Sequence, residues 1–326
     1  MSASRLSTAL ADGLVDLPDG TVSLMRPPAS FDVTGLPPGR LSVIHSFYPE
    51  AMAWANAGYP LLRNLEPCDT AIVVVPRAKA LARAMVAEAC AKARFVIIDG
   101  QKTDGTDSLF KEMRKRLGEL PSLTKAHGRM FWCDASAAFA DWAAPATQAG
   151  PDGFVTTAGV FSDGEIDAGS AFLAEHLPQK LPLRMADLGA GWGYLSHAAL
   201  RRAGVATIDL IEAEALSLDC ARLNVTDPRA AFHWADATKF TAPAYDGIVM
   251  NPPFHTGRSA DPSLGRSFIT AAGRLLKPNG RLWMVANRHL PYEPTLNASF
   301  RSVDSLASNG AFKLFLASKP RGTDRP

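Results

Sequence analysis

The stretch MADLGAGWG, residues 185–193, joins a short apolar segment to three glycines placed at every second position. The apolar residues around Asp187 predict a buried strand, and the pattern from Trp192 to about Ala203 predicts a helix that Gly204 ends. Glycines between a strand and a helix allow a tight turn and bring bare backbone close to a ligand. The spacing D-x-G-x-G-x-G differs from the G-x-G-x-x-G of dinucleotide-binding proteins. We therefore expect a ligand site at the carboxyl end of this strand.

Apolar strands alternate with helical patterns on both sides of this glycine loop. The second half carries further strand patterns near residues 206–213, 232–237, 247–251, 281–287 and 312–318, and the first half carries a shorter series near 41–46, 71–75, 94–99 and 129–134. Such alternation predicts an α/β fold with a doubly wound, Rossmann-like, mostly parallel sheet in each half. The turn-rich stretch 144–153 predicts a boundary between a domain of residues 1–150 and a domain of residues 151–326.

Three strand patterns of the first half match patterns of the second half. The matched pairs begin at Ile72 and Ile248, at Arg94 and Arg281, and at Gly128 and Gly310. We interpret the matches as an internal duplication, although two unrelated α/β domains would also give strands of this composition. In this alignment His45 stands opposite Asp187, and Val75 stands opposite Asn251. The distance from His45 to Val75 is about half of that from Asp187 to Asn251, so the strand that would carry a ribose-binding acid has no room, and no glycine follows His45 directly. We therefore expect the first half to bind no cofactor.

The composition excludes several classes of protein. The chain has 326 residues, is 47% hydrophobic and carries a formal net charge of +2, so a nucleic-acid partner has to be held by local basic patches. No apolar run approaches the roughly 20 residues that span a bilayer, and the first residues lack a signal-peptide pattern. The four cysteines are scattered without the spacing of a zinc site. We expect a soluble, cytoplasmic protein with reduced thiols, no membrane partner and no metal.

Two acidic residues follow the next predicted strands. Glu212 ends a strand about twenty residues after the glycine loop, where a carboxylate can accept hydrogen bonds from both hydroxyls of a ribose. Asp236, followed by Ala237, ends the third strand and can accept from an adenine amino group. Ligands of open α/β sheets lie across the carboxyl ends of the strands, so these acids and Asp187 should converge on one crevice. A single acid at such a place is as often a helix cap.

The motif Asn251-Pro252-Pro253-Phe254 follows the fourth strand. Consecutive prolines fix φ and remove two backbone donors, so their carbonyls are available as acceptors. An amide oxygen, a proline carbonyl and an aromatic face together suit a planar group that bears an exocyclic NH2. Holding both amino protons aligns the nitrogen for attack on an electrophile, and no strong base is needed because the nitrogen becomes acidic once it is alkylated. The alternative is a rigid turn capped by Asn251.

These motifs resemble the class I S-adenosylmethionine-dependent methyltransferases that modify amino nitrogens. The segments 159–173, NPPFH and 286–296 further resemble the bacterial small-subunit rRNA guanine-N2 methyltransferases of the RsmC type, whose N-terminal domain is a degenerate copy of the catalytic fold. The resemblance implies transfer of a methyl group from S-adenosylmethionine to a guanosine N2 of 16S rRNA. It assigns to the cofactor Asp187, Gly189, Gly191, Gly193, Glu212, Asp236, Ala237 and Asn251, with Phe161 and Asp167 ranked lower, and to the target amine Asn251, Pro252, Pro253 and Phe254.

Candidate RNA contacts are basic or imidazole side chains near the site, with one from the first half. They are Arg258, Arg288, His255 and Lys115. The cluster around Lys115 has the spacing of a solvated helix face, which is the alternative for that residue. The expected partner is ribosomal RNA or the small subunit, bound by a monomer. The sequence also allows three other functions. The chain could transfer the methyl group to adenine N6 or to a protein glutamine, act as a nicotinamide-dependent oxidoreductase, or serve as an inactive RNA-binding scaffold.

Overall fold

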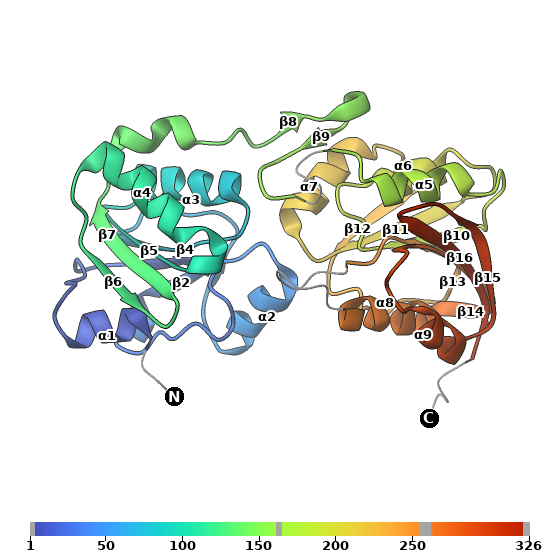
Figure 1. Ribbon diagram of the computed structural model, residues 1–326, viewed down its shortest axis with the longest axis horizontal. Coiled ribbons are helices and arrows are strands. Elements are labelled where there is room, and N and C mark those ends of the chain that lie inside the picture. The colour runs from blue at the N-terminus through green and yellow to red at the C-terminus, as the bar shows by residue number, and fades with distance from the viewer. Residues whose placement is uncertain (1–3, 161–164, 254–261, 322–326) are drawn as a thin grey trace. The chain divides into compact units, whose positions relative to one another are not determined.

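The computed structural model describes residues 4–160, 165–253 and 262–321. Contacts between residues divide the chain into two compact units, Met1–Thr147 and Gln148–Pro326, which are coloured blue to green and green to red in Figure 1. Each unit is built on its own seven-stranded sheet, and we describe the two units separately.

The second unit has a mostly parallel sheet with one antiparallel end. From one edge to the other its strands are β12 (Ala230–Trp234), β11 (Thr207–Glu212), β10 (Arg184–Leu188), β13 (Tyr245–Met250), β14 (Leu276–Asn287), β16 (Phe312–Pro320) and β15 (Phe300–Ser308). The first five run parallel, whereas β16 is antiparallel to β14 and to β15. β10 is the middle one of the five parallel strands, and its neighbours β11 and β13 bring their carboxyl ends to the same edge as the glycine loop.

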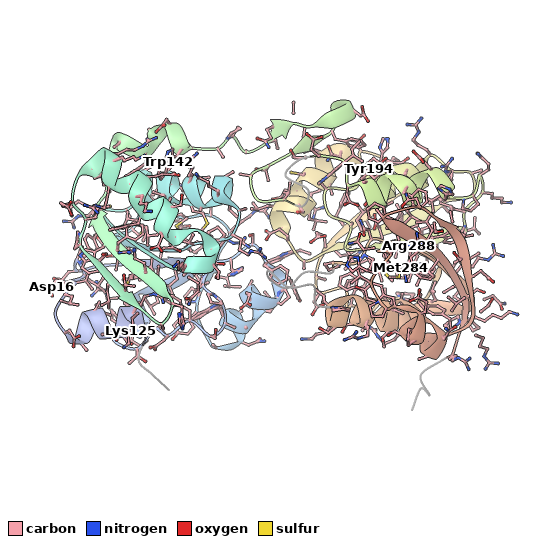
Figure 2. All side chains as sticks on the ribbon, in the orientation of Figure 1. Asp16, Lys125, Trp142, Tyr194, Met284 and Arg288 are labelled. Carbon is pink, nitrogen blue, oxygen red and sulfur yellow. The ribbon has the colours of Figure 1, made fainter. Side chains whose placement is uncertain are left out.

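Helices cover both faces of this sheet, as the doubly wound pattern predicts (Figure 1). One face carries α5 (Ala168–His176), α6 (Tyr194–Leu200) and α7 (Ala215–Asn224), and the other carries α8 (Pro262–Leu275) and α9 (Glu293–Ser299). The strands are apolar on both sides because each face is buried under helices. Met284, in the middle of β14, is fully buried in this way (Figure 2). A short hairpin, β8 (Gln148–Ala149) and β9 (Val155–Thr156), precedes the sheet.

The first unit repeats the same strand order. Its sheet runs β3 (Leu61–Leu62), β2 (Leu41–Ile44), β1 (Val22–Met25), β4 (Thr70–Val74), β5 (Phe95–Gln101), β7 (Gly128–Asp134) and β6 (Ser122–Lys125), with β7 antiparallel to β5 and to β6. Its helices are α1 (Arg5–Ala11), α2 (Tyr48–Asn56), α3 (Lys79–Lys92) and α4 (Thr106–Leu117), joined by short 3-10 turns. The two sheets correspond strand for strand, which confirms the prediction of a second copy of one α/β fold.

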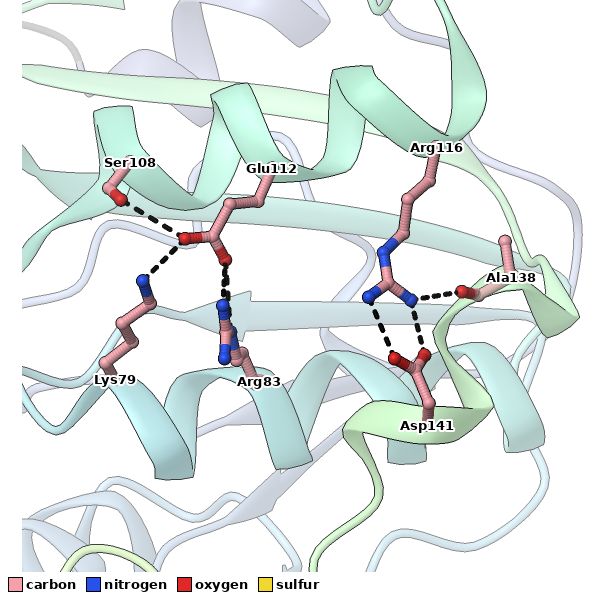
Figure 3. Close-up of polar contacts among 7 residues, drawn as sticks. All are labelled: Lys79, Arg83, Ser108, Glu112, Arg116, Ala138 and Asp141. Carbon is pink, nitrogen blue, oxygen red and sulfur yellow. Dashed lines mark hydrogen bonds and ion pairs between the residues drawn. The ribbon is translucent and has the colours of Figure 1, made fainter.

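Ion pairs tie neighbouring helices of the first unit together (Figure 3). Glu112 of α4 accepts from Lys79 at 2.6 Å and from Arg83 at 2.8 Å, both on α3. All three side chains are at least partly exposed, so we expect the pairs to fix the packing of α3 on α4 more than to add stability.

The register of the sheets corrects one detail of the sequence alignment. In the second unit Asp187 pairs with Val249. The residue of the first unit that matches Val249 is Val73, and Val73 pairs with Met25. Met25 therefore stands in the place of Asp187, and the placement of His45 there was wrong. The error arose because β1 has only four residues and no glycine turn after it, so the next strand, β2, was aligned with β10.

The same register locates the first unit's counterpart of Glu212. Met25 pairs with Ile44 and Asp187 pairs with Leu210, so Ser46, two residues after Ile44, matches Glu212. The strand expected to carry a ribose-binding acid is thus present in the first unit, contrary to the sequence alignment, but it is followed by a serine. No α-helix forms between β1 and β2, where the second unit has α6; the segment is Pro-rich and holds only one 3-10 turn, Pro38–Arg40.

Candidate functional site

The three glycines of the loop between β10 and α6 all have positive φ angles. The values are 74° at Gly189, 55° at Gly191 and 95° at Gly193, a region that other residues enter only with strain. A Cβ on Gly193 would lie 2.9 Å from Cγ2 of Val225, so this glycine is required by packing. A Cβ on Gly191 would meet no atom of the described residues within 4 Å, so the backbone there faces open space. Gly191 is therefore where the loop can approach a ligand.

Asp187 lies directly before the loop and is fully buried. Its Oδ2 accepts a hydrogen bond from the Ser196 hydroxyl at 2.7 Å, whereas its Oδ1 has no hydrogen-bond partner among the described residues. Burial raises the pKa of Asp187 to about 7, with the nearby Glu212 carboxylate adding to the shift and Ser196 opposing it. A buried acid with an unused oxygen is suited to a ligand that brings a donor or a positive charge.

Glu212 ends β11 beside the loop. Its Oε2 accepts from the Gly191 backbone N–H at 2.8 Å, and its Oε1 accepts from the Glu214 backbone N–H at 2.7 Å. These bonds fix both oxygens at the edge where β10 and β11 end. Burial is the main cause that raises the pKa of Glu212 above its usual value. Glu212 as a whole residue is only partly buried, and each carboxylate oxygen can accept a further hydrogen bond.

Asp236 and Ala237 follow β12 at the same edge. Asp236 Oδ1 accepts from the backbone N–H of Thr238 at 2.9 Å and from its hydroxyl at 2.6 Å, a local turn that caps the chain. Its Oδ2 lies 4.0 Å from Nζ of Lys239. Ala237 is buried in the same apolar cluster as Leu188 and Ile211. The structure thus brings Asp236 to the edge of the site but gives one of its oxygens a structural contact.

Asn251 follows β13, one strand away from the glycine loop. The register pairs Asp187 with Val249, so Asn251 comes just after the last paired residues, at the same end of the sheet as the glycine loop. Its amide nitrogen donates to Asp167 Oδ1 at 2.7 Å and to the Ser170 hydroxyl at 2.9 Å. Both amide protons are therefore engaged, and Asn251 Oδ1 accepts no hydrogen bond from the residues that the structure describes. Next to it, Pro252 is buried, and Pro253 is partly exposed.

Sequence reasoning missed the contacts that hold this edge together. Trp192, the bulky residue between two loop glycines, is buried against Phe154, with 5.0 Å between ring centroids. Asn224 donates to the carbonyls of Trp192 and Val155, each at 2.9 Å, and so attaches β9 to the loop. Ser196 and Ser170 were not singled out either. The only sequence signal for Ser170 was its position three residues after Asp167, the spacing of a helix cap.

Four predicted site residues lie outside the described residues, namely Phe161, Phe254, His255 and Arg258. Arg288 is described: it follows β14, is exposed, and its backbone N–H donates to Ala311 (Figure 2). Its side chain is 3.5 Å from the Asn309 carbonyl. It remains available for a phosphate.

Lys115 lies on the exposed side of α4. Its two neighbours in the basic cluster are engaged within the first unit: Arg114 pairs with Glu119, and Arg116 pairs with Asp141 (Figure 3). Lys115 makes no ion pair or side-chain hydrogen bond with any residue that the structure describes. Of the three adjacent cations, it is therefore the one whose charge is not already neutralised locally.

The described part of the site offers backbone and carboxylate contacts to a ligand. Within the described ranges, no group of three His, Cys, Asp or Glu side chains could hold a metal ion. None of the helices in the described residues is long and apolar enough to cross a membrane. A hollow lined by Leu183, Pro278 and Arg281 lies at the amino ends of the strands, away from the residues discussed above.

Comparisons with known proteins agree with this architecture. The family model described as "Methyltransferase small domain" matches residues 152–316. The ribosomal RNA small subunit methyltransferase C of Shewanella halifaxensis is 31% identical over 78% of each chain, and that of Shewanella pealeana is 30% identical over 76% of each chain. The fold is that of the T. thermophilus 16S rRNA N2 methyltransferase RsmC, solved with AdoMet and guanosine. Its TM-score is 0.78 at 22% identity, over 97% of this chain and 92% of that one. The resemblance inferred from the sequence motifs is confirmed: the chain belongs to the methyltransferase small domain family and, within it, to the ribosomal RNA small subunit methyltransferase C proteins.

Proposed function

We propose that the chain transfers a methyl group from S-adenosylmethionine to the exocyclic N2 of a guanosine in small-subunit rRNA. The observation that carries this proposal is the orientation of Asn251, whose amide nitrogen is occupied by Asp167 and Ser170. No described residue donates to its oxygen, which lies at the strand end next to the glycine loop. The name of the Shewanella relatives and the AdoMet and guanosine bound to the T. thermophilus protein support the same activity.

The residues at the strand ends fit the cofactor. Asp187 has an unused, buried oxygen, and Gly191 exposes its backbone to open space. We assign the methionine end of the cofactor to Asp187 and the loop glycines, the ribose to Glu212, and the adenine to Asp236 and Ala237. The cofactor supplies an electrophilic methyl group on a sulfonium. Since Asp236 Oδ1 already bonds Thr238, its Oδ2 is the oxygen available to an adenine amino group.

The reaction needs alignment more than base strength. Asn251 Oδ1 and the Pro252 carbonyl accept the two protons of the target amine and hold its nitrogen toward the methyl donor. With the cofactor bound, the N–CH3 bond would form in line as the sulfonium S–CH3 bond breaks and S-adenosylhomocysteine leaves. The proton would then pass to solvent, because an alkylated amine nitrogen is acidic. Phe254, outside the described residues, is assigned to stack on the base, and Phe161 to border the site.

The partner follows from the same proposal. We assign ribosomal RNA or the small subunit, in the cytoplasm, bound by a monomer without a membrane partner. Phosphate contacts are assigned to Arg288 and Lys115, whose side chains are exposed, and to Arg258 and His255. Replacing Arg288 should weaken RNA binding and reduce its salt dependence while cofactor binding is kept.

The decisive experiment compares Asn251→Ala with Glu212→Ala. Asn251→Ala should lower kcat by about a hundredfold or more with cofactor affinity nearly unchanged, whereas Glu212→Ala should mainly weaken cofactor binding. Mass mapping of rRNA from cells with and without the gene should show the loss of one N2-methylguanosine. Loss of an N6-methyladenosine or of a methylated protein glutamine would point to the rival transfers. Cofactor binding without turnover on any RNA would point to the scaffold.

A further inference from the structure

The segment before the glycine strand contacts the acceptor motif directly. Asp167 lies 84 residues before Asn251 in the chain, yet its Oδ1 accepts the Asn251 amide at 2.7 Å. Ser170, which is buried, accepts the same amide nitrogen through its hydroxyl at 2.9 Å. Asp167 also caps α5, because the same Oδ1 accepts the Ser170 backbone N–H at 2.8 Å. One carboxylate thus anchors both the helix and the acceptor amide.

We propose that Asp167 and Ser170 are positioning residues that set the amide orientation of Asn251, an inference that rests on the proposed function. An asparagine amide can rotate by half a turn with little change in shape. In the rotated form Asn251 Oδ1 would face the Asp167 carboxylate, and its NH2 would face the NH2 of the target. Acceptor would meet acceptor and donor would meet donor, so the carboxylate of Asp167 excludes that orientation.

The same contact explains why an amide is needed at this position. An aspartate at residue 251 would place its carboxylate at hydrogen-bond distance from the Asp167 carboxylate, and two like charges at that distance repel strongly. A carboxylate could equally accept a target amine, so the choice of asparagine follows from Asp167. Asp167 is therefore assigned to hold Asn251, in place of the cofactor contact that the sequence suggested.

The test exchanges the two side chains. Asp167→Ala and Asn251→Asp should each lower kcat by about tenfold to a hundredfold, while KM for S-adenosylmethionine changes about twofold or less. The double variant, Asp167→Asn with Asn251→Asp, restores a donor–acceptor pair with reversed direction. It should recover kcat by about tenfold over Asn251→Asp alone. Ser170→Ala should give a smaller loss, because the backbone N–H of residue 170 still bonds Asp167.

A matched control separates positioning from helix capping. Ser4 caps α1 in the first unit, where its hydroxyl accepts the Ser7 N–H at 3.0 Å. Ser4→Ala should lower the thermal midpoint to a similar extent as Asp167→Ala and leave kcat unchanged. If Asp167→Ala keeps full kcat, or if the exchanged pair is no better than Asn251→Asp, the proposal is overturned.

Exchange of the Asn251 amide protons does not depend on turnover, so it tests the role of Asp167 independently of the proposed function. The Asn251 side-chain amide protons should exchange slowly with solvent in the NMR spectrum of the free protein, and Asp167→Ala should remove the protection. Slow exchange that persists in Asp167→Ala would contradict the inference, even if wild type methylates RNA. Protection lost in Asp167→Ala, with no methylation of any RNA by wild type, would instead refute the proposed function and leave the anchoring role of Asp167 intact.

Discussion

Replacing Asp187 by asparagine should stabilise the free protein in a pH-dependent way. The asparagine is of similar size and can still accept the Ser196 hydroxyl, so the substitution removes mainly the ionisation of a fully buried group. The pKa of Asp187 is raised by burial from 3.8 to about 7 in the folded protein. Between these values the folded state keeps a proton that the unfolded state has released.

The sign and size of the effect follow from proton linkage. Because the folded state binds more protons between about pH 4 and pH 7, the free energy of unfolding of the wild type falls as the pH rises through this window. A shift of about 3 units at about 1.4 kcal/mol per unit corresponds to roughly 4 kcal/mol. The stability of Asp187→Asn minus that of the wild type should therefore grow by roughly 4 kcal/mol from pH 4 to pH 8, and then stay constant.

Denaturant unfolding of both proteins at several pH values measures this difference, and the effects of titrating groups that do not interact with Asp187 cancel in the comparison. Ser196→Ala is a useful companion, because removing the hydroxyl that lowers the pKa of Asp187 should extend the decline of stability to higher pH. The same Asp187→Asn variant should bind S-adenosylmethionine more weakly, since it loses the charge assigned to the methionine end. A stability difference that does not change with pH would refute the account of Asp187.

Three further substitutions test the packing of the glycine loop and a buried ion pair. Gly193→Ala should destabilise the fold by roughly 2–4 kcal/mol, because strain at positive φ adds to the clash with Val225, whereas Gly191→Ala should cost about 1–2 kcal/mol and weaken cofactor binding more than stability. Thermal unfolding and calorimetry should separate the two glycines, and equal effects would contradict the open space at Gly191. In the first unit, Arg5→Ala should cost about 3–5 kcal/mol in denaturant unfolding, because it leaves the buried Asp99 without its ion-pair partner. A change below about 1 kcal/mol would show that the pair is solvated.

The sequence predicted those parts of the site that depend on local pattern. The glycine loop, Glu212 and Asn251 each follow a strand immediately, so their place at one edge of the sheet followed from the strand order of a doubly wound fold. The anchoring of Asn251 by Asp167 could not be predicted, because it joins residues far apart in the chain and depends on the packing of α5. A D-x-x-S spacing indicates a helix cap, but it does not predict that the carboxylate accepts from a second donor elsewhere in the chain.

In the first unit, sequence analysis predicted the overall fold but not the alignment of individual strands. The strand order of this unit could be expected from a duplication, but β1 and β3 are too short to give a periodic pattern, and the alignment slipped by one strand. The burial of Trp192 is a related case, because local pattern does not predict that a large side chain between two loop glycines is buried. Only the structure shows that Phe154 and Asn224 accommodate it.

Side chains of the first unit occupy the positions where the second unit has its candidate cofactor contacts. Met25 replaces the acid, and Arg26, directly after it, donates to Ser46, which stands where the second unit has Glu212. The Pro27 carbonyl accepts a hydrogen bond from the buried Trp54 indole N–H at 3.0 Å. This backbone group is therefore engaged within the first unit, at the strand end where the second unit has its glycine loop. We therefore expect calorimetry to give one S-adenosylmethionine site per chain, and Glu212→Ala to weaken that site. Two sites, or one site whose affinity Glu212→Ala leaves unchanged, would mean that the contacts at these strand ends do not prevent the first unit from binding the cofactor.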